Sequence, residues 1–199
     1  FLSTPGQNTE VFNERDPESL PWDDKGIDIV VESTGVFREK KQLEKHINAG
    51  ASKVILTVPS KDEIDYTIVI GVNEDGLDKS HHIVSNASCT TNCLAPMAKI
   101  IDENFGIIKG VINTVHAYTN DQSLSDVPHK DWRRSRAAAE NIIPTSTGAA
   151  RAVGKVLPGL KGKLDGIASR VPVPDGSVVD LFLELEKETT VNDVNTVIL

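Results

Sequence analysis

The sequence predicts an α/β protein in which half of a doubly wound domain precedes an α+β domain with a mostly antiparallel sheet. Before residue 87, short strands and a helix alternate, which is typical of a βαβ unit and a parallel sheet. After residue 88, the expected strands become longer and alternate between polar and apolar residues, which favours an antiparallel sheet. A length of 199 residues allows one large or two small domains. We place the boundary between residues 87 and 88.

The first region, residues 1–87, has β-branched strands and one polar helix with an apolar face. In chain order, its expected elements are a strand over Ile27–Val31, a helix from about Arg38 to Gly50, and strands over Lys53–Pro59, Tyr66–Ile70 and His82–Ser85.

The second region, residues 88–199, opens with a helix that ends near Phe105. Its other expected elements are strands over Lys109–Tyr118, Gly166–Val173 and Val178–Glu186, a short helix over Gly148–Leu157, and an amphipathic pattern over Val191–Leu199. Between the first strand and the short helix lies a polar stretch, Thr119–Asn141, without a clear period. Stretches of this kind in compact domains are functional or disordered.

The two ends of the chain suggest a longer polypeptide. Phe1 is not an initiator methionine, and the helical pattern at Leu199 is unfinished. We expect the chain to be an internal piece of a larger protein.

Composition and charge exclude several classes of function. A net charge of −8 argues against broad binding to nucleic acid or to membrane surfaces. The chain has neither a long apolar run nor a secretory leader pattern. Cys89 and Cys93 are four positions apart on an expected helix, so a disulfide is not expected. A reducing, cytoplasmic location fits best, and no metal site is expected.

The segment Ser88–Cys93 carries the most chemical information. The strand-like run Ile83–Ser85 precedes it and the apolar-periodic helix Leu94–Phe105 follows, so Cys89 is expected at or near a helix N-terminus. Free backbone N–H groups and the helix dipole stabilise an anion there. A thiol in this position is favoured as a thiolate, which is a nucleophile.

A structural interpretation of these cysteines also remains open. Cys89, Cys93, Met97 and Ile100 share one helical face, so both thiols could be small core hydrophobes. Cys93 lies inside the helix, and we expect it to be a core residue. For Cys89, position alone leaves the two interpretations balanced.

His116 is the candidate partner of the thiol. It lies where the strand Val111–Val115 runs towards a loop, a place where catalytic groups often occur. A single histidine is more often structural, so a Cys–His pair is only suggested. The other histidines have polar neighbours and are expected at the surface: His46, His81, His82 and His129.

Hydroxyl and basic residues gather in the second region. Thr147 and Gly148 open a short helix, where backbone N–H groups can bind an anion. Arg170 lies in an otherwise apolar strand, and a charge in that position needs an anionic partner. In contrast, we expect Arg133 and Arg136 to pair at the surface with the acidic residues Asp131 and Glu140.

Five segments, in this order along nearly the whole chain, resemble one known family. They are Val31–Gly35, Ser85–Cys93, Thr114–Thr119, Pro144–Ala150 and Arg170–Pro172. The family is phosphorylating glyceraldehyde-3-phosphate dehydrogenase, and the cysteine-containing segment alone is highly specific. The resemblance implies a Rossmann-type NAD-binding domain, of which residues 1–87 are the second half, and a catalytic domain over residues 88–199, truncated at its C-terminus.

The resemblance also implies roles for single residues. Cys89 matches the family's nucleophile and His116 its base, acting through a thioester intermediate. Positions that hold the substrate phosphate and the attacking inorganic phosphate are matched by Ser88, Thr90, Thr119, Arg134, Thr147, Gly148 and Arg170. Arg15, Thr34 and Thr57 resemble cofactor contacts, and the stretch Thr119–Asn141 resembles a loop that reaches a neighbouring subunit, which implies a homotetramer.

Some expected features of the family are not found. The chain has no Gly-x-Gly-x-x-Gly sequence followed by an acidic residue at dinucleotide spacing. The choice between NAD and NADP therefore stays open, and we expect this polypeptide alone to bind NAD weakly and to turn over poorly. Three alternative functions also remain: an erythrose-4-phosphate dehydrogenase of the same fold, an inactive binding protein, and a thiol-acyl hydrolase.

Overall fold

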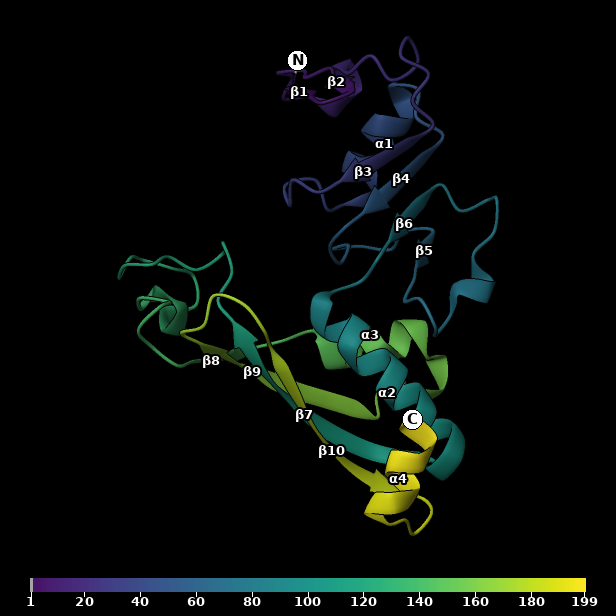
Figure 1. The fold of residues 1–199 in the computed structure, drawn as a ribbon, viewed down its shortest axis with the longest axis vertical. Coiled ribbons are helices and arrows are strands. Elements are labelled where there is room, and N and C mark those ends of the chain that lie inside the picture. The colour runs from purple at the N-terminus through teal and green to yellow at the C-terminus, as the bar shows by residue number, and fades with distance from the viewer. Residues whose placement is uncertain (1) are drawn as a thin grey trace. The chain divides into compact units, whose positions relative to one another are not determined.

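The computed structural model describes residues 2–199, which form two compact units (Figure 1). The first unit comprises the chain up to Ile68 together with Gly76–Ala87. The second comprises Val69–Asp75 and Ser88–Leu199. The short segment Val69–Asp75 belongs to the second unit, and Lys99 Nζ of that unit donates to the carbonyl oxygens of Gly71 and Val72, at 3.2 and 3.1 Å.

The sheet of the first unit is entirely parallel, with the order β3-β4-β6-β5. Its strands are β3 (Ile29–Glu32), β4 (Lys53–Leu56), β5 (Tyr66–Thr67) and β6 (Ile83–Ser85). Helix α1 (Lys40–Asn48) connects β3 to β4, which confirms the expected βαβ unit. The core beneath α1 contains the buried side chains Leu43, Val54, Leu56 and Ile83.

Two parts of the chain before α2 differ from the prediction. The expected strand Tyr66–Ile70 was too long, because the chain leaves the sheet after Thr67. Beyond it, Asn73 Oδ1 accepts from the Val69 N–H at 2.8 Å, and Gly71 has φ +81°, so the backbone turns. The antiparallel hairpin of β1 (Leu2–Thr4) and β2 (Gln7–Thr9) was not expected either. The 3-10 helices η1 (Pro17–Ser19) and η2 (Glu74–Gly76) complete this part of the chain.

The sheet of the second unit has the order β10-β7-β9-β8. Its strands are β7 (Ile107–Ala117), β8 (Ile143–Ser146), β9 (Leu164–Val171) and β10 (Val178–Leu185). Two of the three pairings are antiparallel and only β7–β9 is parallel, which confirms the predicted mostly antiparallel sheet. Strand β8 was not expected.

Helices α2 (Cys89–Phe105) and α3 (Ala149–Val156) pack against each other on the same face of this sheet (Figure 1). A third helix, α4 (Val191–Ile198), contacts α2. The 3-10 helix η4 (Pro158–Leu160) follows α3. The opposite face of the sheet keeps Val111, Ile167 and Phe182 exposed.

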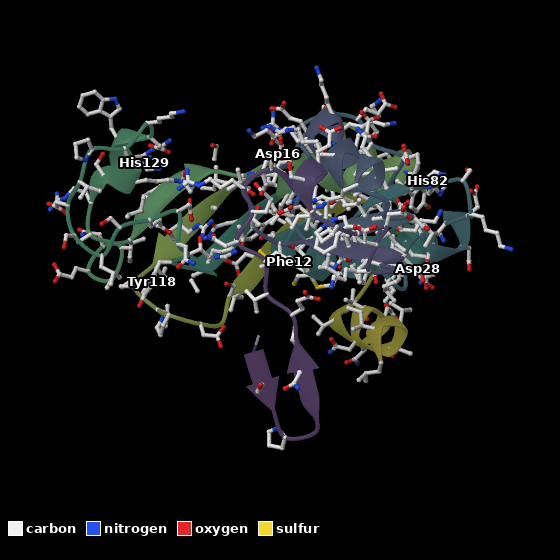
Figure 2. All side chains as sticks on the ribbon, turned by 90° about the horizontal axis from the view of Figure 1, so that it is seen from above. Phe12, Asp16, Asp28, His82, Tyr118 and His129 are labelled. Atoms are coloured by element: carbon white, nitrogen blue, oxygen red, sulfur yellow. The ribbon has the colours of Figure 1, made fainter. Side chains whose placement is uncertain are left out.

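The stretch between β7 and β8 contains a single short element, the 3-10 helix η3 (Trp132–Ser135). His129 lies in this stretch, ahead of η3 (Figure 2), and its ring nitrogen Nδ1 accepts from the Asp131 N–H at 2.9 Å. The stretch is held by local hydrogen bonds of this kind. Within residues 2–199, none of the helices combines the length and the apolar character needed to cross a membrane.

Candidate active site

Helix α2 begins at Cys89, immediately after its N-cap residue Ser88. The Ser88 hydroxyl accepts from the Thr91 N–H at 3.0 Å, which satisfies one of the free donors at the helix end. The side chain of Cys89 is exposed and a free thiol. Because the dipole of a 17-residue helix favours negative charge at this end, the sulfur lies where an anion is stabilised.

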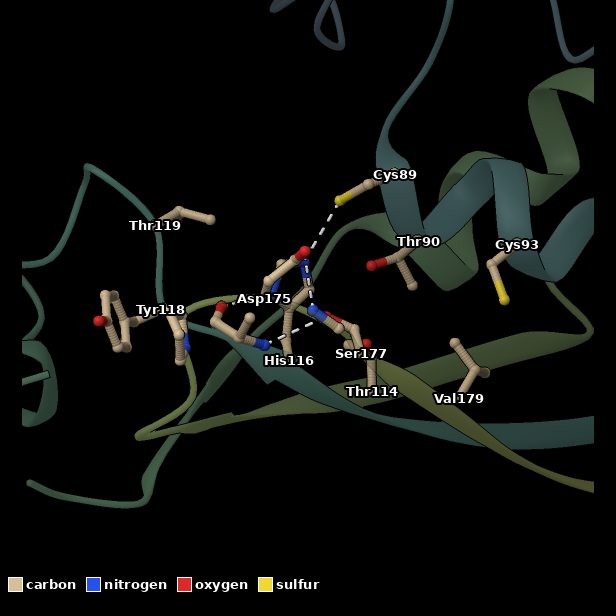
Figure 3. Close-up of a pocket in the computed structure, with 13 residues that line it drawn as sticks. Cys89, Thr90, Cys93, Thr114, His116, Tyr118, Thr119, Asp175, Ser177 and Val179 are labelled. Carbon is tan, nitrogen blue, oxygen red and sulfur yellow. Dashed lines mark hydrogen bonds between the residues drawn. The ribbon is translucent and has the colours of Figure 1, made fainter. Parts of the chain in front are cut away.

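The imidazole of His116 faces this sulfur, with Nε2 3.2 Å from Cys89 Sγ (Figure 3). His116 lies near the end of β7 and its side chain is buried. On the other side of the ring, Nδ1 lies 2.7 Å from the Ala117 carbonyl oxygen. Two acceptors would repel at that distance, so Nδ1 carries a hydrogen and donates it. Nε2 of the neutral ring then holds a lone pair that can accept the thiol proton.

Arg170 of β9 supports the same ring from outside. Its Nη1 donates to the Ala117 carbonyl oxygen at 3.0 Å and to Thr119 Oγ1 at 2.9 Å. Nη1 also lies 3.2 Å from His116 Nδ1, but the hydrogen already assigned to Nδ1 makes this a contact between two donors. Arg170 therefore fixes the carbonyl group that orients the imidazole.

The anionic partner expected for Arg170 is not among its hydrogen-bond partners in the described chain; those partners are neutral oxygens. Burial of the guanidinium lowers the pKa of Arg170, and the nearby positive charge of Arg134 lowers it further, while the interactions with Asp121 and Cys89 act in the opposite direction. Its Nε atom is buried without a hydrogen-bond partner among the described residues. The pKa of Arg170 is therefore lowered overall, because no carboxylate within residues 2–199 contacts the buried guanidinium to compensate its charge.

Asp121 connects Thr119 to Arg134. Its carboxylate accepts from the Thr119 hydroxyl and from Arg134 Nη1. Arg134 Nε in turn donates to Thr145 Oγ1 at 3.0 Å. Hydrogen bonds and close contacts therefore run from Cys89 through His116 and Arg170 to Thr119, Asp121 and Arg134.

The pair opens onto a hollow of about 420 Å³ in the second unit. The side of the hollow formed by α2 and β7 includes Cys89, Thr90, Cys93, Thr114, His116 and Thr119. The turn between β9 and β10, over residues 174–177, forms the other side (Figure 3). A small molecule can therefore approach the thiol and the imidazole together.

Cys93 differs from the prediction, because it is exposed rather than a core residue. The buried face of α2 is formed by Leu94, Ala98 and Ile101, which lie on another side of the helix. Cys93 borders the hollow, but Figure 3 shows its sulfur directed away from His116. The expectation of a core thiol was therefore wrong.

The remaining predicted phosphate residues lie at helix starts. Gly148 is the N-cap of α3, with open space around it, and Thr147 Oγ1 accepts from the Ala149 N–H at 3.2 Å. The Ser88 hydroxyl is engaged in capping α2, as described above. No described hydrogen bond connects Thr147 to the Cys89–His116 pair.

The predicted cofactor residues lie in the first unit. Thr34 and Thr57 follow the carboxyl ends of the neighbouring parallel strands β3 and β4, and both are exposed. Both bind Glu32: Thr34 through its amide and hydroxyl, Thr57 through bonds to the Glu32 carbonyl. Arg15 lies in the exposed segment before η1, where its amide donates to Glu14 Oε1 at 2.7 Å.

One surface prediction was wrong, and one surface ion pair forms with a different partner. His46 is buried, with only 4% of its surface exposed, because it hydrogen-bonds Glu32 and Trp22 inside the first unit. Arg136 pairs with Asp126 at 3.1 Å and not with Glu140. The expected pair of Arg133 and Asp131 is present, at 3.2 Å.

Three groups at the site were not predicted from the sequence: Asp121, the carbonyl of Ala117 and Ser177. Ser177 Oγ accepts from the Ala117 N–H at 3.1 Å, which holds the peptide next to His116. The polar run Thr119–Asp121 after a strand was the available signal for Asp121. A backbone carbonyl and a hydroxyl 60 positions away leave no local pattern.

Comparisons with known proteins agree with this arrangement. Residues 88–199 match the family described as glyceraldehyde 3-phosphate dehydrogenase, C-terminal domain, and residues 1–40 match its NAD binding domain. A glyceraldehyde-3-phosphate dehydrogenase of Streptomyces coelicolor is 62% identical over 195 residues, or 98% of this chain and 58% of the relative.

Two further relatives carry the same name. The protein of Geobacillus stearothermophilus is 62% identical over 191 residues, covering 96% of this chain and 57% of the relative. The protein of Mycobacterium avium is 60% identical over 179 residues, covering 90% of this chain and 52% of the relative. The chain thus spans somewhat more than half the length of the curated relatives it matches. With most of its second unit matched by the family's C-terminal domain, the chain belongs to the glyceraldehyde 3-phosphate dehydrogenase family.

Proposed function

We propose that the natural polypeptide carrying this chain is a phosphorylating glyceraldehyde-3-phosphate dehydrogenase of glycolysis. It oxidises D-glyceraldehyde 3-phosphate to 1,3-bisphosphoglycerate, with NAD as the oxidant and inorganic phosphate as the second substrate. The observation that carries the proposal is the 3.2 Å approach of His116 Nε2 to Cys89 Sγ at the start of α2. The names of the similar proteins support the same activity.

The first step joins the thiol to the aldehyde. His116 Nε2 takes the Cys89 proton, and the thiolate attacks the aldehyde carbon. The new C–S bond leaves an oxyanion, to which the imidazolium returns the proton, giving a hemithioacetal. The orientation of the ring, held through Ala117 and Arg170, keeps Nε2 directed at the reacting atoms.

The second step forms and then cleaves a thioester. His116 removes the proton of the hemithioacetal hydroxyl group as the carbon gives up its hydrogen as hydride. The acyl group is then left on Cys89 as a thioester. An oxygen of inorganic phosphate then attacks the acyl carbon, the C–S bond breaks, and Cys89 leaves as a thiolate. Placement at the helix N-terminus assists this departure because negative charge returns to the sulfur.

Phosphate groups are held by hydroxyl and guanidinium donors of the second unit. The hydroxyl and guanidinium donors are Ser88, Thr90, Thr119, Arg134, Thr147 and Arg170, and Gly148 adds the backbone N–H groups at the start of α3. The contact of Arg170 with Thr119 and the start of α3 at Gly148 support this assignment. Such local donors are needed because the whole chain has a net charge of −8 and repels anions at long range.

Residues 1–87 supply the second half of the NAD-binding domain, and residues 88–199 belong to the catalytic domain. Bound NAD supplies the hydride acceptor. Thr34 and Thr57 fit a dinucleotide because both are exposed at the carboxyl ends of adjacent parallel strands, where such ligands bind. Arg15 is the third proposed contact, and NADP remains an alternative cofactor.

We further propose a homotetramer in the cytoplasm. The exposed apolar residues Val111, Ile167 and Phe182 lie on the sheet face opposite α2 and α3, and burial against another subunit would remove them from water. The stretch Thr119–Asn141 reaches towards a neighbour's cofactor. Two free thiols support a reducing compartment.

The test is NADH formation by the natural polypeptide with each aldehyde, with and without inorganic phosphate. We expect rapid turnover of glyceraldehyde 3-phosphate that requires phosphate. His116→Asn should lower kcat by roughly 10²- to 10⁴-fold, and Cys89→Ser should abolish turnover. Preference for erythrose 4-phosphate without a need for phosphate would contradict the proposal.

A further inference from the structure

Glu32 is a buried acidic residue that contacts both proposed cofactor threonines. It lies at the end of β3, and only 3% of its surface is exposed. Its Oε1 accepts from the Thr34 N–H at 2.8 Å and from the Thr34 hydroxyl at 2.5 Å. Its carbonyl oxygen accepts from the Thr57 N–H at 3.1 Å and from the Thr57 hydroxyl at 3.2 Å.

The other carboxylate oxygen of Glu32 faces inwards, towards α1. Oε2 lies 3.1 Å from His46 Nε2, and the imidazole is 96% buried, with 4% of its surface exposed. His46 Nδ1 lies 3.1 Å from Trp22 Nε1. A continuous hydrogen-bonded chain therefore runs from Trp22 through His46 and Glu32 to the exposed Thr34.

The donors and acceptors of this chain have only one consistent arrangement. An indole N–H can only donate, so His46 Nδ1 must accept. The hydrogen of the neutral imidazole is then on Nε2 and is donated to Glu32. With Thr34 supplying two more donors, Glu32 accepts three hydrogen bonds and is satisfied as a carboxylate.

Packing alone does not require such a group. A buried carboxylate costs free energy unless it is fully hydrogen-bonded, and an apolar side chain of similar volume would fill the space at no such cost. What the carboxylate adds is a directional hold on Thr34, whose hydroxyl also accepts from the Val36 N–H at 3.1 Å. The turn after β3 is thereby fixed in a single arrangement.

We propose that Trp22, His46 and Glu32 are positioning residues that hold Thr34 and Thr57 for the nicotinamide cofactor. The inference rests on the proposed function only in naming the cofactor. The positioning itself is a property of the first unit that can be measured without any ligand.

The main test uses Glu32→Gln in the natural polypeptide that contains this chain. The amide has nearly the same shape, but its NH₂ group must face either the His46 Nε2–H or the two donors of Thr34. Loss of one hydrogen bond to a charged group predicts an increase of about tenfold in the KM for NAD. The values of kcat and of the KM for the aldehyde should change less than about twofold. Glu44→Gln, an exposed change on α1, is the matched control.

A ligand-free readout separates this inference from the proposed function. Amide hydrogen exchange at Thr34 should accelerate by about tenfold in Glu32→Gln and stay unchanged in Glu44→Gln. A lower kcat with an unchanged KM for NAD, or unchanged exchange at Thr34, would overturn the positioning role. If the wild-type polypeptide shows no NAD-linked activity but Thr34 exchange responds as expected, the proposed function fails and the positioning of the two threonines stands.

A measurement on the wild-type protein covers the case in which Glu32→Gln does not fold. The ¹⁵N chemical shifts of the His46 ring should identify the neutral tautomer with its hydrogen on Nε2. Trp22→Phe should remove the donor to Nδ1 while keeping an aromatic ring, and should shift the Nδ1 resonance. A hydrogen on Nδ1 in the wild-type protein would overturn the inference.

Discussion

The Nε2 atom of His116 lies 3.2 Å from the Sγ atom of Cys89, although 27 positions separate the two residues. Helix α2 and strand β7 follow one another in the chain, and the strand returns beneath the helix so that its far end meets the helix start. The buried ring is held by the Ala117 carbonyl, and the sulfur is exposed. A proton can therefore pass between two groups of which one is fixed and the other is open to substrate.

Cys89 should react with iodoacetamide at pH 7 roughly tenfold faster than Cys93, because only Cys89 has both a helix N-terminus and an imidazole beside it. Both thiols are exposed, so accessibility does not account for the difference. The variants Cys89→Ser and Cys93→Ser each leave one thiol, whose labelling rate is followed by mass spectrometry. Adding His116→Asn should slow the labelling of Cys89. Equal, slow labelling of both thiols would contradict the proposed role.

Arg170→Lys should raise the KM values for glyceraldehyde 3-phosphate and for inorganic phosphate by about tenfold or more. A lysine offers one point charge in place of a guanidinium that contacts both the Ala117 carbonyl and Thr119. Steady-state kinetics of the natural polypeptide test this, with Arg151→Lys, a change at an exposed residue of α3, as the control. Unchanged KM values in Arg170→Lys would contradict the proposed role of Arg170 in binding phosphate.

Asp65→Asn should destabilise the first unit by about 1–3 kcal/mol at pH 7. Asp65 accepts from the N–H groups of His82 and Ile83, at 2.8 and 2.9 Å, and from Lys40 Nζ at 2.8 Å. Partial burial by itself raises the pKa of Asp65, but the Lys40 bond and the two amide bonds outweigh burial and hold it below its ordinary value.

The sign of the pH dependence follows from this lowered pKa. A carboxyl group with a depressed pKa in the folded state stabilises the protein above its unfolded pKa, about 3.9, and loses that contribution as the pH falls through the folded value. In urea unfolding, the free energy of unfolding of Asp65→Asn should therefore be lower than that of the wild type at pH 7, and the difference should be smaller below about pH 4. The exposed change Asp24→Asn is the control. A difference in the free energy of unfolding that stays constant with pH would contradict the lowered pKa of Asp65.

Gly166→Ala should destabilise the second unit by about 1–3 kcal/mol. A Cβ atom at Gly166 would lie 2.3 Å from the Ile112 carbonyl oxygen and 2.4 Å from its Cγ1, inside the paired strands β7 and β9. Gly159→Ala meets no atom within 4 Å and should have little effect on the midpoint of thermal unfolding. Equal midpoints of thermal unfolding for the two variants would show that β7 and β9 can move apart enough to accommodate the added Cβ atom.

Local sequence patterns predicted the main elements because the apolar face of one helix or strand, and the residues at its ends, are set by neighbours in the chain. The β-branched run at β3, the stop at Gly50 and the start of α2 at Cys89 are examples. Strand β8 was missed because Ile143–Ser146 is only four residues long and includes Pro144. Such a short run carries too little periodicity to predict a strand.

Burial was harder to predict than secondary structure. His46 has charged neighbours in sequence, yet it is enclosed because Glu32 and Trp22 supply partners from β3 and from the loop after η1. Cys93 shares a helical face with Met97 and Ile100, yet it is exposed because the buried face of α2 is formed by Leu94 and Ala98 instead. In both cases, the deciding residues lie on other elements or on another side of the same helix.

By itself, the sequence determined the βαβ unit, the three longer strands of the second unit, the position of Cys89 at a helix start and the family to which the chain belongs, because these depend on residue types at fixed short spacings. Only the tertiary structure decided that His116 meets Cys89, that Arg170 steadies the ring through a carbonyl, and that Asp121 joins Thr119 to Arg134. Those contacts depend on how strands pair and helices pack, and non-bonded forces between atoms a few ångströms apart act without regard to distance along the chain.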